Sequence, residues 1–486
     1  MLHLVFAALL TPSQVLAKAR AAEGAMQPGT YRVEVRETLN DGTISYVRTS
    51  QGDNYVSTEQ EGSITRADGR LDGVNWNQNA NGAVLTGRGP SVVDDPYSDA
   101  VNTPEASSSG LSVEDESNGN VVLVIAPRSG LVERRTYDSK TFLLSRIDYD
   151  DPQGRRSFVY SGYRSCFGEM VAARIQYTSE TANDDAVFDL ISCDRIQPGS
   201  VSFAIPPNKP VFDLGSRTSL QIPADFTLTG IVVRVTVAGR GLDFLLDSGS
   251  SESVLDAGVA HELGLNVRNR RTMSFMGTTT VAQTVIDDLA LGDLHARNFA
   301  IEVVPFSRLI DGGYGANTKV VGLLGGDFFA SGRIAVDFSA KTVTMMAPTA
   351  PLATEGWTKL PIQVTSFVPL TVATFSGHKG TFVVDLGAWS TILYQHYFTN
   401  FTRDGLAPVQ GEAYGIANKG QTYRSYNMSR LDIGDLAYAD VLVQVLDAGR
   451  SNDQVGYDGL LGRTFWENFA LIFDYAGQTL YIKPEI

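Results

Sequence analysis

The aspartates Asp247 and Asp385 are the residues whose sequence context most directly suggests chemistry. Each ends an apolar run and is followed two positions later by a glycine, Gly249 or Gly387. Two carboxylates held within hydrogen-bonding distance share one proton, because both cannot ionise without a large electrostatic cost. The charged member of such a pair can activate water, and the neutral member can protonate a leaving group. These two aspartates are the candidate catalytic residues.

Other catalytic and binding chemistry has little support in the sequence. The five histidines are scattered, no H-x-x-x-H pair occurs, and two cysteines are too few for a zinc cluster. We therefore expect no metal and no cofactor. The net charge of −15 and the lack of a basic tract argue against nucleic-acid binding. No apolar run is long enough for an integral membrane segment.

An internal repeat contains the two aspartates. The Gly-Leu-Leu-Gly motif at 322–325 returns at 459–462, and the strand and glycine turn before each aspartate recur at a matching spacing. The repeat predicts two similar units, 225–347 and 362–486, joined by a linker. Because the repeat has only two copies, it indicates a two-lobed body and excludes a solenoid.

The region before the repeat is different in character. Residues 25–210 alternate apolar and polar side chains in short segments separated by turn signals, which is typical of an antiparallel β domain. Within it, the acid-rich stretch 91–120 is expected to be an exposed loop. With 43% hydrophobic and 19% charged residues, the chain as a whole is predicted to be globular and mostly β.

The N-terminus and the cysteines bear on the cellular compartment. An apolar stretch at 2–10 and a small-residue pattern ending at Ala17 suggest a leader over residues 1–24, and hence export to the periplasm or medium. No Lys or Arg precedes the stretch, which leaves a buried strand or helix as the alternative. Cys166 and Cys193 lie on two segments that are expected to form neighbouring strands, which predicts a disulfide. In a cytosolic protein they would instead be two buried thiols.

The two repeat units resemble the lobes of aspartic proteases of the retropepsin and pepsin clan. The shared motifs are the Asp-Ser-Gly-Ser turn at 247–250, a short helix ending in Leu-Gly-Leu at 263–265, and Gly-Leu-Leu-Gly-x-x-Phe before a closing hairpin. The resemblance spans 226–484. It implies a bilobal β fold on one monomeric chain, in which each lobe contributes one aspartate. It also implies a polypeptide substrate bound in an extended conformation. The N-terminal region resembles the half-barrels of periplasmic lipoprotein carriers, notably at 137–147.

The resemblance also implies supporting roles for the residues around each aspartate. Family members carry Ser or Thr after the aspartate, and its hydroxyl bonds across the lobe interface; Ser248 fits this pattern, whereas Leu386 cannot. Ser250 could hydrogen-bond the Asp247 carboxylate, while Ala388 has no hydroxyl for Asp385. We therefore expect Asp247 to carry the charge and its partner to carry the proton.

Two hairpin tips are candidates for substrate-covering flaps. Met276 and Gly277 lie at the expected position in the first unit, and Tyr414 and Gly415 lie at the equivalent position in the second. The alternative is that both are ordinary hairpin tips without contact to substrate.

The sequence thus predicts an exported aspartic endopeptidase. The main alternative is a non-catalytic peptide- or lipid-binding protein with a degenerate aspartic-protease fold, which Leu386 favours. In a third interpretation the N-terminal domain carries a lipid or peptide. That domain could also be an inhibitory pro-region released by cleavage within 91–120 or 206–223.

Overall fold

The computed structural model is mostly β, and its described residues form two compact units. The described residues are 10–88, 110–116, 119–126, 131–149, 154–180, 185–212, 214–227, 230–274, 278–305, 320–401, 409–414, 420–446 and 457–485. The first unit contains those up to Gly52 and those between 110 and 202. The second contains those from 53 to 88 and those from 203 onward. Within these ranges, none of the helices combines the length and apolar character needed to cross a bilayer.

Over the described residues, the first unit is an antiparallel sheet with a helix against it. It contains α1 (Pro12–Glu23), β1 (Thr30–Thr38), β2 (Thr43–Gln51), β7 (Gly110–Glu116), β8 (Asn120–Ala126), β9 (Glu133–Asp138), β10 (Leu144–Tyr149), β11 (Arg156–Ser161), β12 (Arg164–Cys166), β13 (Glu169–Val171), β14 (Arg174–Ser179) and β15 (Ala186–Ile196). The sheet has the order β2-β1-β15-β14-β11-β10-β9-β8-β7, and β12 pairs with β13. The expected N-terminal antiparallel β fold is confirmed.

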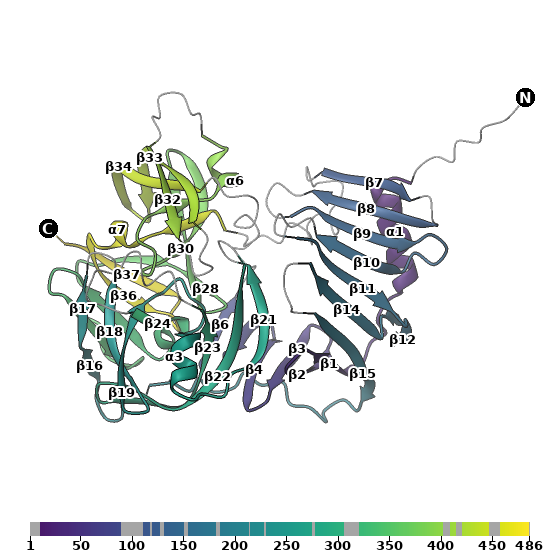
Figure 1. Ribbon diagram of the computed structural model, residues 1–486, viewed down its shortest axis with the longest axis horizontal. Helices are drawn as coiled ribbons and strands as arrows, with labels where there is room; N and C mark the ends of the chain where they lie inside the picture. The colour runs from purple at the N-terminus through teal and green to yellow at the C-terminus, as the bar shows by residue number, and fades with distance from the viewer. Residues whose placement is uncertain are drawn as a thin grey trace, which may run out of the picture. The chain divides into compact units, whose positions relative to one another are not determined.

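Helix α1 is part of the core of this unit. Thr11 caps it through a capping box with Gln14, and Figure 1 shows the helix lying against the sheet at β7 and β8. The apolar face of the helix is buried with side chains of β8 and β9: Val15, Leu16, Ala19, Leu123, Ile125 and Tyr137. The leader predicted for residues 1–24 therefore overlaps a packed helix, and cleavage after Ala17 would cut that helix in the middle.

The two cysteines also belong to the first unit. Cys166 at the end of β12 and Cys193 in β15 form a disulfide, with their Cα atoms 6.0 Å apart. This cross-link connects the small β12–β13 hairpin to a central strand of the sheet.

The second unit begins with four strands that precede both repeat units in the chain. They are β3 (Asn54–Glu61), β4 (Ile64–Leu71), β5 (Val74–Gln78) and β6 (Val84–Arg88), in antiparallel order β6-β5-β4-β3. The sequence predicts a domain spanning 25–210 that includes them, and in the structure they group with the two lobes in the second compact unit. The physical reason is burial: Ala83 and Leu85 are inside the hydrophobic core that the two lobes share.

The first lobe closes around an eight-stranded sheet. It contains β16 (Ser219–Ile222), β17 (Ala224–Phe226), β18 (Ile231–Val237), β19 (Arg240–Leu246), β20 (Val254–Asp256), α3 (Ala257–Glu262), β21 (Arg268–Ser274), β22 (Thr278–Leu291), β23 (Leu294–Val304), β24 (Val320–Leu324), α5 (Gly326–Phe329), β25 (Arg333–Asp337) and β26 (Thr342–Met346). The sheet order is β17-β18-β19-β24-β20-β23-β22-β21. The expected helix before Gly264 is α3, with residues 254–256 forming β20 ahead of it.

The second lobe repeats this arrangement. It contains β27 (Thr358–Pro361), β28 (Gln363–Thr365), β29 (Val368–Phe375), β30 (His378–Val384), β31 (Ile392–Leu393), α6 (Gln395–Phe398), β32 (Val409–Tyr414), β33 (Gly420–Ile433), β34 (Leu436–Leu446), β35 (Gly459–Leu461), α7 (Arg463–Trp466), β36 (Phe469–Asp474) and β37 (Thr479–Pro484). Its sheet, β28-β29-β30-β35-β31-β34-β33-β32, has the same succession of strands. A six-stranded sheet, β16-β26-β25-β36-β37-β27, joins the lobes through the β25–β36 pair.

Candidate active site

The two aspartates occupy the same place in each lobe. Asp247 follows β19, and its backbone N–H donates to the carbonyl of Leu324 in β24 at 3.0 Å. Asp385 follows β30 and makes the equivalent bond to Leu461 in β35, also at 3.0 Å. Buried apolar strands thus carry each aspartate to the start of a tight turn, and the Gly-Leu-Leu-Gly strand holds it there.

The turns of the two lobes face each other. A β-carbon added at Gly249 would clash with the Asp385 carboxyl group, and one added at Gly387 would clash with the Asp247 carboxyl group. Each aspartate side chain therefore lies over the glycine of the opposite turn, a close approach that only glycine permits. The structure brings Asp247 and Asp385 together within one compact unit.

The burial and the hydrogen-bond partners of the two carboxyl groups shift their pKa values. Burial raises the pKa of both aspartates above the ordinary range, and the negative charge of Asp385 raises the pKa of Asp247 further. At Asp385 the rise is opposed by backbone N–H bonds from Ala388 and Gly387, each 2.8 Å, and by a hydrogen bond from Asp247. Asp247 also accepts the backbone N–H of Gly249 at 2.9 Å, which lowers its pKa, so it is the negative charge of Asp385 that favours the proton on Asp247.

This placement is opposite to the expectation from sequence. Ser250 does not donate its hydroxyl proton to Asp247; its Oγ donates to the carbonyl oxygen of Glu252 at 2.7 Å. The sequence comparison weighed only side-chain hydroxyls, whereas backbone N–H groups of both turns also donate: Gly249 to Asp247 at 2.9 Å, and Gly387 and Ala388 to Asp385 at 2.8 Å. Ser250 thus gives Asp247 no hydroxyl hydrogen bond, and which aspartate carries the charge stays a prediction.

Ser248 connects the two turns across the lobe interface. Its fully buried Oγ donates to the carbonyl oxygen of Val384 at 2.7 Å and accepts the N–H of Leu386 at 3.0 Å. Leu386 is also fully buried but has no hydroxyl to return these bonds. The cross-lobe connection implied by the family resemblance is thus present from the first lobe only.

The flap candidates fall largely outside the described residues. Met276, Gly277 and Gly415 all lie outside them. Tyr414 is the last residue of β32, where its backbone pairs with Gly420. The flap assignments remain predictions.

Asp327, which the sequence did not single out as a site residue, contacts the end of the turn that follows Asp247. Asp327 in α5 is fully buried and accepts hydrogen bonds from Ser253 Oγ at 2.6 Å and from Asn81 Nδ2 at 3.1 Å. Burial raises the pKa of Asp327 to about 6. Its position after Gly-Leu-Leu-Gly could have marked it, but nothing in the sequence connects it to Asn81.

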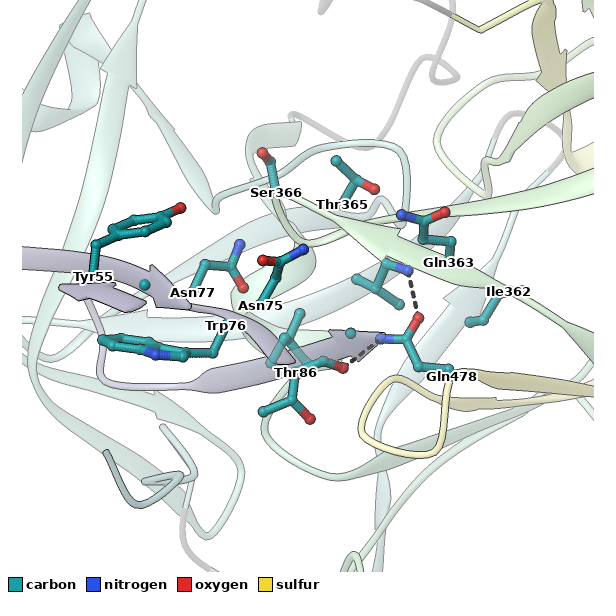
Figure 2. Close-up of a pocket in the computed structure, with 14 residues that line it drawn as sticks. Tyr55, Asn75, Trp76, Asn77, Thr86, Ile362, Gln363, Thr365, Ser366 and Gln478 are labelled. Atoms are coloured by element: carbon teal, nitrogen blue, oxygen red, sulfur yellow. Dashed lines mark hydrogen bonds between the residues drawn. The ribbon is translucent and has the colours of Figure 1, made fainter. Parts of the chain in front are cut away.

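A separate cavity of about 410 Å³ lies elsewhere in this unit, lined by strands β3–β6, by residues 362–366 of the second lobe and by Gln478 between β36 and β37 (Figure 2). Gln478 spans part of it, because its side chain donates to the Thr86 carbonyl at 3.4 Å and accepts the Val364 N–H at 2.9 Å. Its lining is uncharged: Tyr55, Gly69, Asn75, Trp76, Asn77, Leu85, Thr86, Gly87, Ile362, Gln363, Val364, Thr365, Ser366 and Gln478. No candidate catalytic residue is among these lining residues.

Comparisons with known proteins agree with the site at the level of family. Residues 233–328, which include the first aspartate and its turn, match the family model described as aspartyl protease. No curated protein matches the chain. The match supports an aspartic protease-like assignment for this chain.

Several solved structures are similar at low identity. An aspartic proteinase from Irpex lacteus is 17% identical, with a TM-score of 0.36, over 55% of this chain and 97% of that one. A DUF1329 family protein from Desulfovibrio piger is 14% identical, with a TM-score of 0.29, over 39% and 93%. A LolA superfamily protein from Nitrosomonas europaea is 15% identical, with a TM-score of 0.27, over 39% and 96%.

Proposed function

We propose that this chain is an aspartic endopeptidase with Asp247 and Asp385 as its catalytic pair. The observation that carries the proposal is that the two carboxyl groups, one from each lobe, lie over each other's glycine in a buried site. Gly249 and Gly387 let the carboxyl groups approach, and Ser248 holds the turns together.

The proposed reaction follows from the placement of the proton. Asp385 accepts a proton from a water molecule as its oxygen attacks the peptide carbonyl carbon, and Asp247 donates its proton to the carbonyl oxygen. When the tetrahedral intermediate collapses, the carbon–nitrogen bond breaks and the proton on Asp385 passes to the leaving nitrogen. A hydroxyl proton of the intermediate returns to Asp247, which restores the pair.

We further propose that the substrate is a polypeptide in an extended conformation, held by the flap hairpins around Gly277 and Gly415. Backbone pairing with an extended strand provides affinity that is largely independent of side chains. Because both aspartates come from one chain within one compact unit, a monomer suffices for the site.

The alternative is a protein that binds peptides or lipids without turnover. Leu386 favours it, because the second lobe contributes no hydroxyl to the cross-lobe connection. In that case the aspartates would be retained only to hold the two turns together.

Export is part of the proposal and rests on two features of the chain. Residues 2–10 are apolar, and Cys166 and Cys193 form a disulfide, which persists in oxidising compartments. Thiol labelling of protein denatured directly from intact cells tests this: two unlabelled cysteines support export, whereas two labelled cysteines oppose it.

The proposed activity is tested with a mixed peptide library incubated at several pH values between about pH 3 and pH 7.5, because the two carboxyl groups titrate as a coupled pair. Wild type should cleave, and Asp247→Asn should not. Arg240→Ala is a matched control, because Arg240 forms an exposed ion pair with Glu262 in the same lobe. If the wild-type protein binds library peptides but leaves them intact, the alternative is favoured.

A further inference from the structure

We propose that Arg66, in a strand outside both lobes, is a positioning residue for the first active-site turn. Here the first active-site turn means residues 247–253, which connect β19 to β20. The inference rests on the proposed function for its kinetic part. Its structural part, that β4 orders this turn, can be tested without any activity.

The contact between Arg66 and the turn is a paired, charge-assisted one. Arg66 Nε donates to Glu252 Oε1 at 3.0 Å, and its terminal nitrogen Nη2 donates to Glu252 Oε2 at 2.9 Å. Both side chains are largely shielded, at 19% and 17% exposure. Two parallel bonds of this kind fix orientation as well as distance, which a single point charge would not do.

Glu252 is linked to the catalytic aspartate through the turn itself. Its carbonyl oxygen accepts the Ser250 hydroxyl at 2.7 Å, and the Ser250 carbonyl oxygen accepts the N–H of Gly326 at 2.7 Å. Ser250 is three residues from Asp247 and next to Gly249, over which the Asp385 carboxyl lies. A displacement of Glu252 would therefore be passed to the glycine that sets the distance between the carboxyl groups.

The guanidinium group of Arg66 also contacts carboxylates of its own hairpin, which β3 and β4 form. It lies 3.5 Å from the carboxylates of Glu59 and Glu61 in β3, and it donates to Gln283 of β22 at 3.4 Å. The Glu61 carboxylate is almost fully buried. Arg66 thus neutralises carboxylates of its own hairpin and of the turn at the same time, so the hairpin and the turn are held as one body.

A second contact holds the other end of the turn. Asn81, between β5 and β6, pairs with the backbone of Ala300 at 2.8 and 2.9 Å and donates to Asp327, which accepts the Ser253 hydroxyl. Both Glu252 and Ser253 are therefore supported by residues that precede the lobes by more than a hundred positions. These contacts make residues 53–88 a component of the protease body. They argue against a pro-region that is discarded by a cut within 206–223.

The test compares Arg66→Met, Arg66→Lys and Glu252→Gln with wild type in the full-length protein. Hydrogen–deuterium exchange of the peptide covering 247–253 reports the order of the turn, and steady-state kinetics on one cleaved peptide report its effect on turnover. Arg240→Ala, which removes an exposed ion pair of the same lobe, is the matched control. If Arg66→Met does not fold, Arg66→Lys decides, because it keeps the charge but loses the paired geometry.

We expect exchange of the turn to rise about tenfold in Arg66→Met and kcat to fall about 10- to 100-fold with little change in KM, since small misplacements of catalytic groups have effects of this size. Arg66→Lys and Glu252→Gln should have exchange rates and kcat values between those of Arg66→Met and those of wild type. Exchange and kcat equal to wild type in all three variants would overturn the inference. If wild type cleaves nothing while exchange rises as expected, the proposed function fails and the structural role of Arg66 stands.

Discussion

Replacing Ser248 with alanine should weaken the association of the two lobes more than any other loss of a single hydroxyl near the site. The Ser248 hydroxyl is fully buried and satisfies two backbone groups of the opposite lobe, the carbonyl of Val384 at 2.7 Å and the N–H of Leu386 at 3.0 Å. Without it both groups remain buried and unpaired. At about 1 to 3 kcal/mol for each such group, the free energy of unfolding should fall by about 2 to 6 kcal/mol.

Urea unfolding followed by tryptophan fluorescence measures this loss, and two variants calibrate it. Ser248→Thr keeps the hydroxyl and should retain most of the stability. Ser250→Ala removes a single bond to the Glu252 carbonyl and should lose about 1 kcal/mol. A loss below about 0.5 kcal/mol in Ser248→Ala, the range of ordinary surface substitutions, would show that the hydroxyl does not connect the lobes.

Three other substitutions, one of them paired with a control, have defined outcomes. Burial and neighbouring Glu252 raise the pKa of Glu302 from its usual 4.5 to about 8, so its proton favours the folded state most at low pH, and this contribution is lost as the pH rises through 8. In wild type this makes the free energy of unfolding fall between about pH 4.5 and pH 8, by up to about 1.4 kcal/mol per pH unit, and Glu302→Gln should flatten that fall. Urea titrations at several pH values measure it. Parallel plots of unfolding free energy against pH for wild type and Glu302→Gln would contradict the prediction. Leu85→Ala should lower the unfolding free energy of the unit that contains the lobes by about 2 to 5 kcal/mol, because Leu85 is buried in its core. Leu442 is 65% exposed, so Leu442→Ala should leave this free energy nearly unchanged. Equal effects of the two substitutions would show that β6 does not pack in that core. Gly387→Ala puts a methyl group against the Asp247 carboxyl and should reduce kcat/KM about 100-fold, and unchanged kinetics would mean that the turns do not approach as described.

The local architecture of the lobes was predictable because its determinants are local. An apolar run ending in Asp-x-Gly specifies a buried strand followed by a tight turn, and the repeat pointed to both Asp247 and Asp385. The resemblance to two-lobed proteases then indicated that the turns face each other. The structure shows the same succession of strands in both lobe sheets.

Two of the features that the sequence did not reveal depend on contact between residues far apart in the sequence. Alternating polarity predicted that β3–β6 are strands, but periodicity does not specify which core Leu85 enters. The pairing of Arg66 with Glu252 joins positions 186 residues apart and leaves no local pattern. A third feature is local: both aspartates accept backbone N–H groups of their own turns, which side-chain identity does not reveal.

The most direct test of the central claim is the turnover of one cleaved peptide by Asp385→Asn. In the second lobe Leu386 follows the aspartate and provides no hydroxyl, so the participation of this lobe in catalysis is the part of the claim that most needs a test. If the two carboxyl groups act as one pair, kcat/KM should fall at least about 1000-fold, as it should in Asp247→Asn. If Asp385→Asn retains activity within about tenfold of wild type while Asp247→Asn is inactive, the second lobe is a scaffold and the two-aspartate mechanism is wrong.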